Sequence, residues 1–391
     1  MLLDLLIYVF YLSNGIVPDI KYQNYEIYLF IIVLVNDTIL IGGLSMAFFE
    51  STNVMYKTQI GAAMCGIFYQ LWFKILARTN KSSIFNTSDT LRDNTKFGRT
   101  DFVAKMYAKL KAKYLPLMCV TLFLIVIGFN VSFLRFLVDS TAINFNNPDF
   151  YVVPFLFKFW STDTFSEYLV VMSLQIVFFC PEIVAYLSSI VYVCFILASL
   201  EVHVEEMAVI INHTFDTENY LSKDATMQRY NRNETIDLYR KVKRLIRYQQ
   251  FLYRYVNDVI GMGKLIFNSM LSMVILSFIL LVLSIQVAVD MLAKLKIVFV
   301  VITFMMVYFI LCYLGETIRQ MNHSIQSALY DAPWYSLTPH LRKYLFMLMN
   351  QTQSELHVKL VDMYTIDLDF YASTMKIVYS ATNFILLHHK L

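Results

Sequence analysis

Residues 167–200 read EYLVVMSLQIVFFCPEIVAYLSSIVYVCFILASL, and this stretch decides the fold because its only charged residues are Glu167 and Glu182. A helix needs about 20 apolar residues to cross the hydrocarbon core of a bilayer. The stretch is longer than one crossing requires. It therefore predicts a transmembrane helix that continues beyond the membrane into the charged residues that follow.

Further apolar stretches have the length of a membrane crossing. They lie at residues 25–49, 60–78, 115–138, 265–290, 297–318 and 366–388. With 58% hydrophobic and only 16% charged residues, the 391-residue chain cannot cover itself with the polar surface of a water-soluble globule. The sequence therefore predicts an all-α membrane protein with seven transmembrane helices in a lipid bilayer.

The Lys and Arg residues indicate the orientation, because basic residues collect in cytoplasmic loops. Most of them lie in segments 79–114, 201–264 and 319–365. The other loops contain only Lys57, Lys158, Lys294 and Lys296. The N-terminus is therefore predicted to be cytoplasmic and the C-terminus extracellular, the reverse of a G-protein-coupled receptor. Asn-x-Ser/Thr triplets in the cytoplasmic segments should carry no glycan.

These features divide the chain into successive parts. They are a cytoplasmic N-terminal segment at 1–24, helices one to four at 25–200, a cytoplasmic helical segment at 201–264, helices five and six at 265–318, a cytoplasmic helical anchor at 319–365, and a seventh helix at 366–391. The cytoplasmic segments alternate charged and apolar residues at helical spacing, so we expect helices with one buried face. Binding of calmodulin or anionic lipid is an alternative to packing within the bundle.

No pattern typical of a catalytic or metal site occurs in the sequence. The five cysteines lie in apolar stretches, where cysteine behaves as a small hydrophobic residue, and the histidines lack the spacing of zinc ligands. The chain has no phosphate-binding loop, no dinucleotide fingerprint and no nucleophile with a base at motif spacing. We therefore expect no enzyme activity, cofactor, metal or nucleic-acid partner.

Ionisable residues inside the predicted spans include Asp37, Arg135 and Glu182, and Asn130 and Gln175 are among the uncharged polar ones. Such groups are costly in a bilayer and are candidates for function by default. They are too few and too dispersed for a proton relay or a voltage sensor. Two interpretations remain open: hydrogen bonds between helices, or the lining of a ligand cavity, for which Gln175 and Asn130 are the candidates.

The C-terminal residues carry the most specific pattern. Residues 330–353 read YDAPWYSLTPHLRKYLFMLMNQTQ, in which a Tyr precedes a Trp-Tyr pair and a basic pair opens a Leu/Met-rich helix with a Gln-containing end. Residues 368–391 read LDFYASTMKIVYSATNFILLHHKL, a final helix with a lysine, a serine and a short apolar tail. Near the N-terminus, residues 15–18 read GIVP. These motifs and the inverted topology resemble those of insect odorant receptors.

The resemblance implies a ligand-gated, non-selective cation channel of four subunits, at least one of them the odorant co-receptor, in the plasma membrane of olfactory sensory neurons. It also implies a pore lined by the last helix. The related gustatory receptors end in Thr-Tyr, a short apolar run and Gln-Phe, whereas this chain has Thr382-Asn383 and His389-Lys390 at those places. The departure favours an odour-binding subunit over the co-receptor. A gustatory-type homotetramer and a G-protein-coupled receptor remain the alternatives.

Volatile odorants are small and apolar, so we expect an aromatic-walled cavity with few polar groups. In the predicted topology it lies in the outer halves of helices two, three, four and six. These contain Ile60, Met64, Phe68, Phe129, Ser132, Phe133, Phe136, Met172, Gln175, Ile176, Thr303 and Tyr308. For each of these residues, packing between helices is the competing interpretation.

One line of residues at helical spacing runs along the last helix through Tyr379, Thr382, Leu386 and Lys390. The resemblance places a hydrophobic constriction at Leu386, where a ring of large apolar side chains can close a pore by dewetting. Contact of Leu386 with lipid or with another helix is the alternative.

Overall fold

The structure is a computed structural model that describes residues 2–13, 16, 23–79, 81–82, 84–87, 89, 100–124, 164–215, 232–287, 291–332, 339–353, 358–360 and 364–389. Its principal helices are α1 (Leu2–Ser13), α2 (Gln23–Glu50), α3 (Val54–Thr79), α5 (Thr100–Lys109), η2 (Leu110–Tyr114), α7 (Phe165–Thr214), α9 (Arg232–Val287), α10 (Met291–Asp331), α11 (Pro339–Thr352) and α12 (Leu368–His389). Strands β1 (Lys359–Leu360) and β2 (Tyr364–Thr365) form a short antiparallel hairpin. The prediction of an all-α protein is confirmed.

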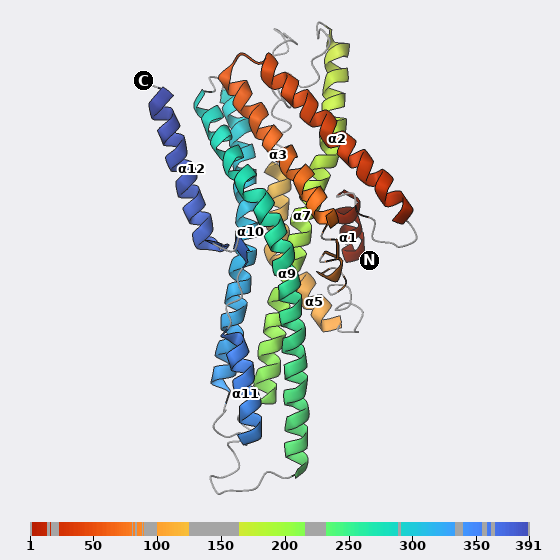
Figure 1. Ribbon diagram of the computed structural model, residues 1–391, viewed down its shortest axis with the longest axis vertical. Helices are drawn as coiled ribbons and strands as arrows, with labels where there is room; N and C mark the ends of the chain where they lie inside the picture. The colour runs from red at the N-terminus through yellow and green to blue at the C-terminus, as the bar shows by residue number, and fades with distance from the viewer. Residues whose placement is uncertain are drawn as a thin grey trace.

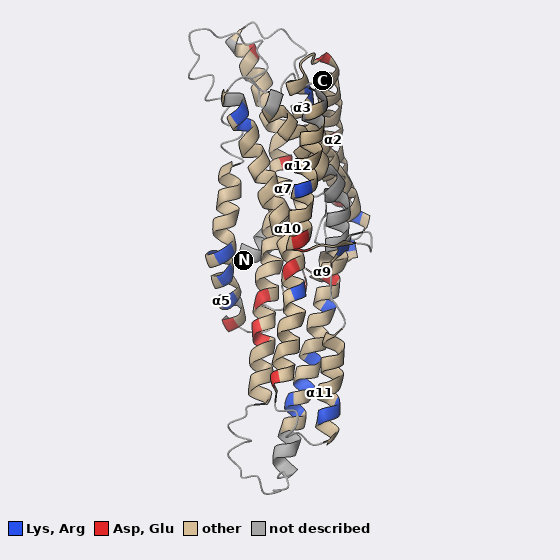
Figure 2. Ribbon diagram, turned by 90° about the vertical axis from the view of Figure 1, so that its left-hand side faces the viewer, with Lys and Arg blue, Asp and Glu red and all other residues tan. Residues whose placement is uncertain are grey.

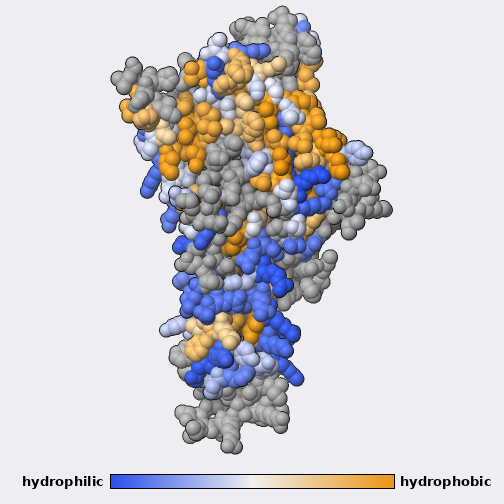
Figure 3. Space-filling view, viewed as in Figure 1, coloured by the Kyte–Doolittle hydropathy of each residue, from blue (hydrophilic) through white to orange (hydrophobic). Residues whose placement is uncertain are grey.

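Three long helices, α7, α9 and α10, run side by side and give the molecule its elongated form (Figure 1). Helices α2, α3 and α12 lie along one half of this bundle, and α11 lies along the other half (Figure 1). Charged residues gather in the half that contains α5 and α11 (Figure 2). The opposite half has a largely hydrophobic surface on the face in view (Figure 3). The two halves therefore have the surface properties of a membrane part and a water-exposed part.

Four helical stretches in the described part are long and apolar enough to cross a membrane: Glu26–Glu50, Val54–Thr79, Ser166–Thr214 and Lys294–Asp331. They contain the spans predicted at 25–49, 60–78, 167–200 and 297–318 almost entirely. The spans predicted at 265–290 and 366–388 coincide with parts of α9 and α12, and the one at 115–138 is helical to residue 124 and then leaves the described residues. The total of seven spans and their orientation stay predictions.

Helix α7 has 50 residues, so it extends about 75 Å against a hydrocarbon core of about 30 Å. It begins with a capping box, in which Thr164 and Glu167 satisfy each other's backbone N–H groups. It ends at Thr214, so the apolar stretch does continue as a helix beyond residue 200. This extension supplies one wall of the charged half of the bundle.

Helix α11 buries Leu341, Leu345 and Leu348, which share one helical face, in the core that α9 and α10 also line. Tyr253 of α9 donates a hydrogen bond to Asn322 of α10 at 2.7 Å, and the Asn322 amide donates to the carbonyl of Thr352 at 2.7 Å. Apolar packing and buried hydrogen bonds therefore hold α11 against the ends of the two long helices.

The N-terminal helix α1 packs mainly on α7. The ring of Phe10 stacks on Tyr192 with centroids 4.4 Å apart, and the hydroxyl groups of Ser13 and Ser188 are hydrogen-bonded at 2.9 Å. Helix α1 is therefore part of the core rather than an appendage, and it brings Phe10 to the site described next.

Candidate ligand-binding site

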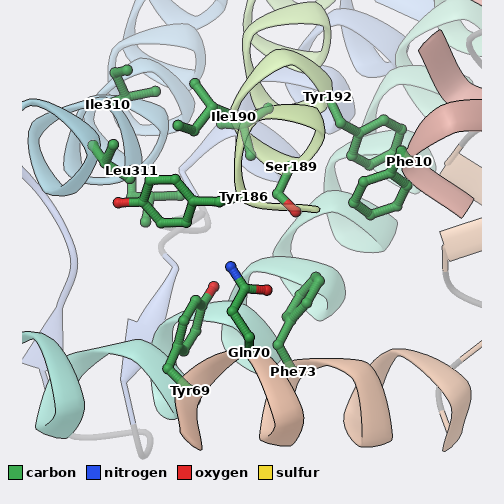
Figure 4. Close-up of a pocket in the computed structure, with 12 residues that line it drawn as sticks. Phe10, Tyr69, Gln70, Phe73, Tyr186, Ser189, Ile190, Tyr192, Ile310 and Leu311 are labelled. Carbon is green, nitrogen blue, oxygen red and sulfur yellow. The ribbon is translucent and has the colours of Figure 1, made fainter. Parts of the chain in front are cut away.

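A cavity of about 30 Å³ lies between helices α1, α3, α7 and α10 (Figure 4). Its walls are formed by Phe10, Tyr69, Gln70, Phe73, Tyr186, Ser189, Ile190, Tyr192, Val193, Val307, Ile310 and Leu311. Most of these side chains are aromatic or aliphatic, and a volume of this size holds about two water molecules. The cavity therefore resembles a small-molecule site in composition but accommodates only a small group in its present form.

Helical periodicity brings these residues together. On α7, Tyr186, Ser189, Ile190 and Val193 are spaced by one to four residues and share one helical face. Tyr69, Gln70 and Phe73 do the same on α3, as do Val307, Ile310 and Leu311 on α10. Each helix thus presents one stripe to the cavity, and the Phe10–Tyr192 stack adds the contribution of α1.

The polar side chain most distinctive of the cavity is Gln70, which is 5% exposed and whose Oε1 atom has no hydrogen-bond partner among the described residues. Its amide group faces the middle of the cavity, together with the hydroxyl groups of Tyr69 and Ser189 (Figure 4). The Tyr186 hydroxyl likewise lacks a partner in the described part of the chain. A buried acceptor without a donor is costly. Water or the polar atom of a ligand would remove that cost.

Three of the pocket residues predicted from the sequence do come together. Ile60, Met64 and Met172 belong to a hydrophobic cluster formed by α2, α3 and α7. Gln175 is fully buried on the same helix as Met172. This group lies nearer to the start of α3 and α7 than the cavity residues do, which in the predicted topology means nearer to the outer membrane surface.

The other predicted pocket residues have different surroundings. Phe68 and Ile176 are exposed, and Thr303 donates a hydrogen bond to the carbonyl of Phe299 at 2.9 Å. Tyr308 is buried but contacts α12. Phe129, Ser132, Phe133 and Phe136 lie outside the described residues. The role of all twelve in ligand binding stays a prediction.

The sequence predicts a pocket in the outer halves of helices two, three, four and six. The cavity is lined by α3, α7 and α10, which contain the predicted helices two, four and six, but its residues Gln70, Tyr186 and Phe10 are not among those predicted. A signal for Gln70 was present, since it is an amide within the apolar span predicted at 60–78. No signal pointed to Phe10, because the partner of an N-terminal helix cannot be read from hydropathy.

Helix α10 connects the cavity to the last helix. Val307 lines the cavity, and its neighbour Tyr308 is hydrogen-bonded to Thr374 of α12 at 3.0 Å and packs on the ring of Tyr371 at 5.6 Å. One to two turns further along α10, a Cβ atom on Gly315 would collide with the carbonyl oxygen of Ile366. The absence of a side chain there allows the segment before α12 to pack directly on α10.

The predicted pore residues share one face of α12 by their spacing, but those whose side chains the structure describes differ in exposure. Tyr379 is 71% exposed, whereas Thr382 is 3% exposed and donates a hydrogen bond to the carbonyl of Val378 at 2.7 Å. Leu386 lies on the helix, but its side chain is outside the described part of the structure, as is the whole of Lys390. The assignment of the pore line stays a prediction.

Next to the cavity, the ammonium of Lys74 on α3 contacts Asp37 of α2 and Glu182 of α7, each at 2.9 Å. Of the two interpretations left open for the ionisable residues in the spans, these contacts correspond to hydrogen bonds between helices. Residues far apart in the sequence converge here because α2, α3 and α7 are neighbours. Lys74, within the span predicted at 60–78, is not among the ionisable residues singled out from the sequence.

Comparisons with known proteins agree with this architecture. A family model described as 7tm odorant receptor matches residues 50–379. The solved structure of the insect olfactory receptor OR5 from Machilis hrabei in complex with eugenol is similar over 99% of this chain and 97% of that chain, with 13% identity and a TM-score of 0.75. A second structure of that receptor, covering 97% and 96%, has 14% identity and a TM-score of 0.71. The comparison with curated protein sequences gave no match.

Proposed function

The chain belongs to the 7tm odorant receptor family, whose model covers most of its length, and we propose that it is the odour-binding subunit of a cation channel formed with the odorant co-receptor. As a member of that family it is a receptor rather than an enzyme. The proposed location is the plasma membrane of olfactory sensory neurons, where the apolar helices cross the bilayer and the charged half of the bundle lies in the cytoplasm.

Gln70 is the observation that carries the ligand-binding part of the proposal. Its Oε1 atom is buried without a hydrogen-bond partner among the described residues, in a mostly apolar cavity, so a ligand with an apolar body and one hydroxyl group would satisfy it. The cavity of about 30 Å³ accepts that polar head group, and a larger ligand requires the aromatic side chains around it to move. The eugenol complex of the similar receptor supports a small organic ligand in this fold.

The pocket residues predicted in the outer halves of the helices extend the proposed binding site beyond the cavity. Ile60, Met64 and Met172 form an apolar surface that suits the hydrocarbon part of an odorant, and each buried CH₂ contributes about 0.8 kcal/mol. Shape and chain length would then be selected in the outer region, and the polar head group by Gln70 and its hydroxyl neighbours.

The contacts between α10 and α12 support a route from ligand to pore. A ligand that shifts α10 near Val307 would disturb the hydrogen bond between Tyr308 and Thr374, and with it the position of α12. In the proposed channel, α12 lines the pore, and Leu386 of this subunit contributes to a hydrophobic constriction. Ligand binding opens the channel by favouring the arrangement in which this residue is turned away from the axis.

The direct test is co-expression with the co-receptor and measurement of inward current with a panel of volatiles of matched carbon skeleton, such as alcohols, ketones and alkanes. We expect odour-evoked cation current only in the presence of both subunits, and alcohols as the preferred ligands. Current from this chain alone would indicate a gustatory-type homotetramer. A response that requires a G protein would contradict the channel proposal.

Substitution Leu386→Ala tests the gate in the same cells. Removing the bulk of the constriction should raise the current in the absence of odour or change the ion selectivity. Leu387→Ala, on an exposed neighbouring position, is the matched control. An effect of Leu386→Ala on odour affinity alone would show that this face of α12 does not line the pore.

A further inference from the structure

Lys74 is the centre of a buried ionic cluster that the receptor function does not explain. Its Nζ atom contacts both oxygens of Asp37 at 2.9 and 3.1 Å and both oxygens of Glu182 at 2.9 and 3.0 Å. Asp37 is 0%, Lys74 1% and Glu182 6% exposed. The Asn36 amide adds a hydrogen bond to Glu182 at 3.1 Å. The cluster therefore connects α2, α3 and α7 away from water.

The cluster also lies inside the apolar half of the molecule. Glu26, near the start of α2, pairs with Lys81 at 2.6 Å. Asp37 follows about three helical turns later, about 16 Å along the helix axis, within a stretch long and apolar enough to cross the membrane. A net charge at such a depth is strongly disfavoured.

The charges in this cluster do not balance if both carboxyl groups are ionised, because one ammonium faces two carboxylates. Arg78, one turn further along α3, lies over the ring of Phe30 at 4.3 Å instead. Glu26 is paired with Lys81. The apolar parts of α9 and α10, residues 265–287 and 297–315, contain no charged residue. Nothing in these neighbouring elements supplies a second positive charge to the cluster.

The two carboxyl groups contact the same ammonium nitrogen, each at 2.9 Å, so their oxygen atoms are close neighbours in a site withdrawn from water. Ionisation of both carboxyl groups in one buried site is disfavoured, because two like charges would lie close together and one ammonium cannot neutralise both. We propose that Asp37 and Glu182 share one bound proton, so that the cluster around Lys74 is a proton-binding site with no net charge.

The position of Glu182 gives this site a structural role. It follows Pro181, which has no N–H group to donate to the preceding turn of α7. The carbonyl of Phe178 accepts a hydrogen bond from Asn36 at 3.3 Å, so α2 supports α7 at this point. Tyr186 of the ligand cavity lies one turn beyond Glu182. The protonated cluster therefore fixes α7 immediately before the residues that line the cavity.

Charge-matched variants of the full receptor, expressed with the co-receptor, test this inference through surface expression and thermal stability, which need no odorant. Asp37→Asn and Glu182→Gln each mimic a protonated carboxyl group, so each single variant should reach the surface at close to the wild-type level. The double variant leaves Lys74 without a carboxylate, and Lys74→Met leaves two carboxyl groups without a cation. Both should lower the surface level by about tenfold or more.

The triple variant Lys74→Met, Asp37→Asn, Glu182→Gln should recover part of this loss because its cluster is again neutral. A pH series gives a second readout. Because the folded protein would hold a proton that the unfolded chain releases near the pKa of a free carboxyl group, about 4, the wild-type thermal midpoint should fall as the pH rises above about 5, and by more than that of either single amide variant. Loss of surface expression in both single variants, or equal pH dependence in the wild type and Glu182→Gln, would show that both carboxyl groups are ionised and overturn the inference.

Discussion

Helices α3 and α7 each contribute to two neighbouring polar groups, which differ in whether their buried polar atoms have hydrogen-bond partners. Lys74 on α3 and Glu182 on α7 are buried and fully hydrogen-bonded. One turn away on each helix, the Gln70 side chain and the Tyr186 hydroxyl group are also withdrawn from water, but each has a polar atom without a partner among the described residues. The polar atoms of both pairs are buried, but only those of Lys74 and Glu182 all have hydrogen-bond partners. We infer that Lys74 and Glu182 hold the helices together, whereas Gln70 and Tyr186 are available to a ligand.

This comparison predicts its largest effect at Lys74. Lys74→Met leaves Asp37 and Glu182 buried next to each other without a cation, and breaking a buried ion pair in this way costs about 3–5 kcal/mol. We expect loss of the folded receptor from the surface, measured by labelling of a terminal tag. Lys57→Met, at a partly exposed position, is the control. Normal surface expression of Lys74→Met would mean that the cluster does not hold the helices together.

Gln70→Leu should have the opposite effect on stability. The substitution removes a buried acceptor that has no donor among the described residues, so the free energy of unfolding should rise by about 1–3 kcal/mol. The same variant should respond less to alcohols while keeping its response to alkanes of equal length. A thermal melt and a dose–response series measure the two effects. A lower thermal midpoint would indicate that Gln70 has a structural partner, and the comparison with Lys74 would then fail.

The sequence predicts the helices that carry Lys74, Glu182, Gln70 and Tyr186, but not which of their side chains meet. Hydropathy over windows of about 20 residues finds α2, α3, α7 and α10, because each has to match the thickness of a membrane. The same averaging conceals Gln70 and Lys74, since isolated polar residues scarcely change the mean of an apolar helix. Which carboxylate meets Lys74 depends on how the helices cross, and that is decided by side-chain packing along their whole length.

Two local features, the β1–β2 hairpin and the close approach at Gly315, could not be predicted from the sequence. The predicted anchor at 319–365 contains the expected helices, but it also contains the β1–β2 hairpin, whose strands of two residues are too short for a pattern of alternating residues. In the sequence, nothing distinguishes Gly315 from other glycines in apolar helices. Only the approach of Ile366 to α10 shows why a side chain is excluded there.

A smaller effect is expected where the cavity meets the last helix. Tyr308→Phe removes the hydrogen bond to Thr374 and leaves the ring contact with Tyr371, so stability should fall by about 1 kcal/mol. If this contact transmits ligand binding to α12, the maximal odour-evoked current should fall with little change in surface level. Tyr313→Phe on the same helix is the control. Equal currents in both variants would place the coupling elsewhere.

The smallest effect is expected at Lys81, which repeats the geometry of Lys74 at the edge of the same two helices. Lys81 of the chain after α3 pairs with Glu26 of α2 at 2.6 Å, as Lys74 pairs with Asp37 at 2.9 Å. The side chain of Lys81 is 25% exposed, against 1% for Lys74, and the Glu26 side chain is 7% exposed, so water reaches the pair through the lysine and would fill the space next to Glu26 once that side chain is removed. Lys81→Met should therefore cost about 1 kcal/mol or less, and the loss should shrink further in high salt. Thermal midpoints of the two lysine variants at low and high ionic strength make the measurement. If Lys81→Met were as damaging as Lys74→Met, charge pairing in general, rather than burial of an uncompensated charge, would account for both.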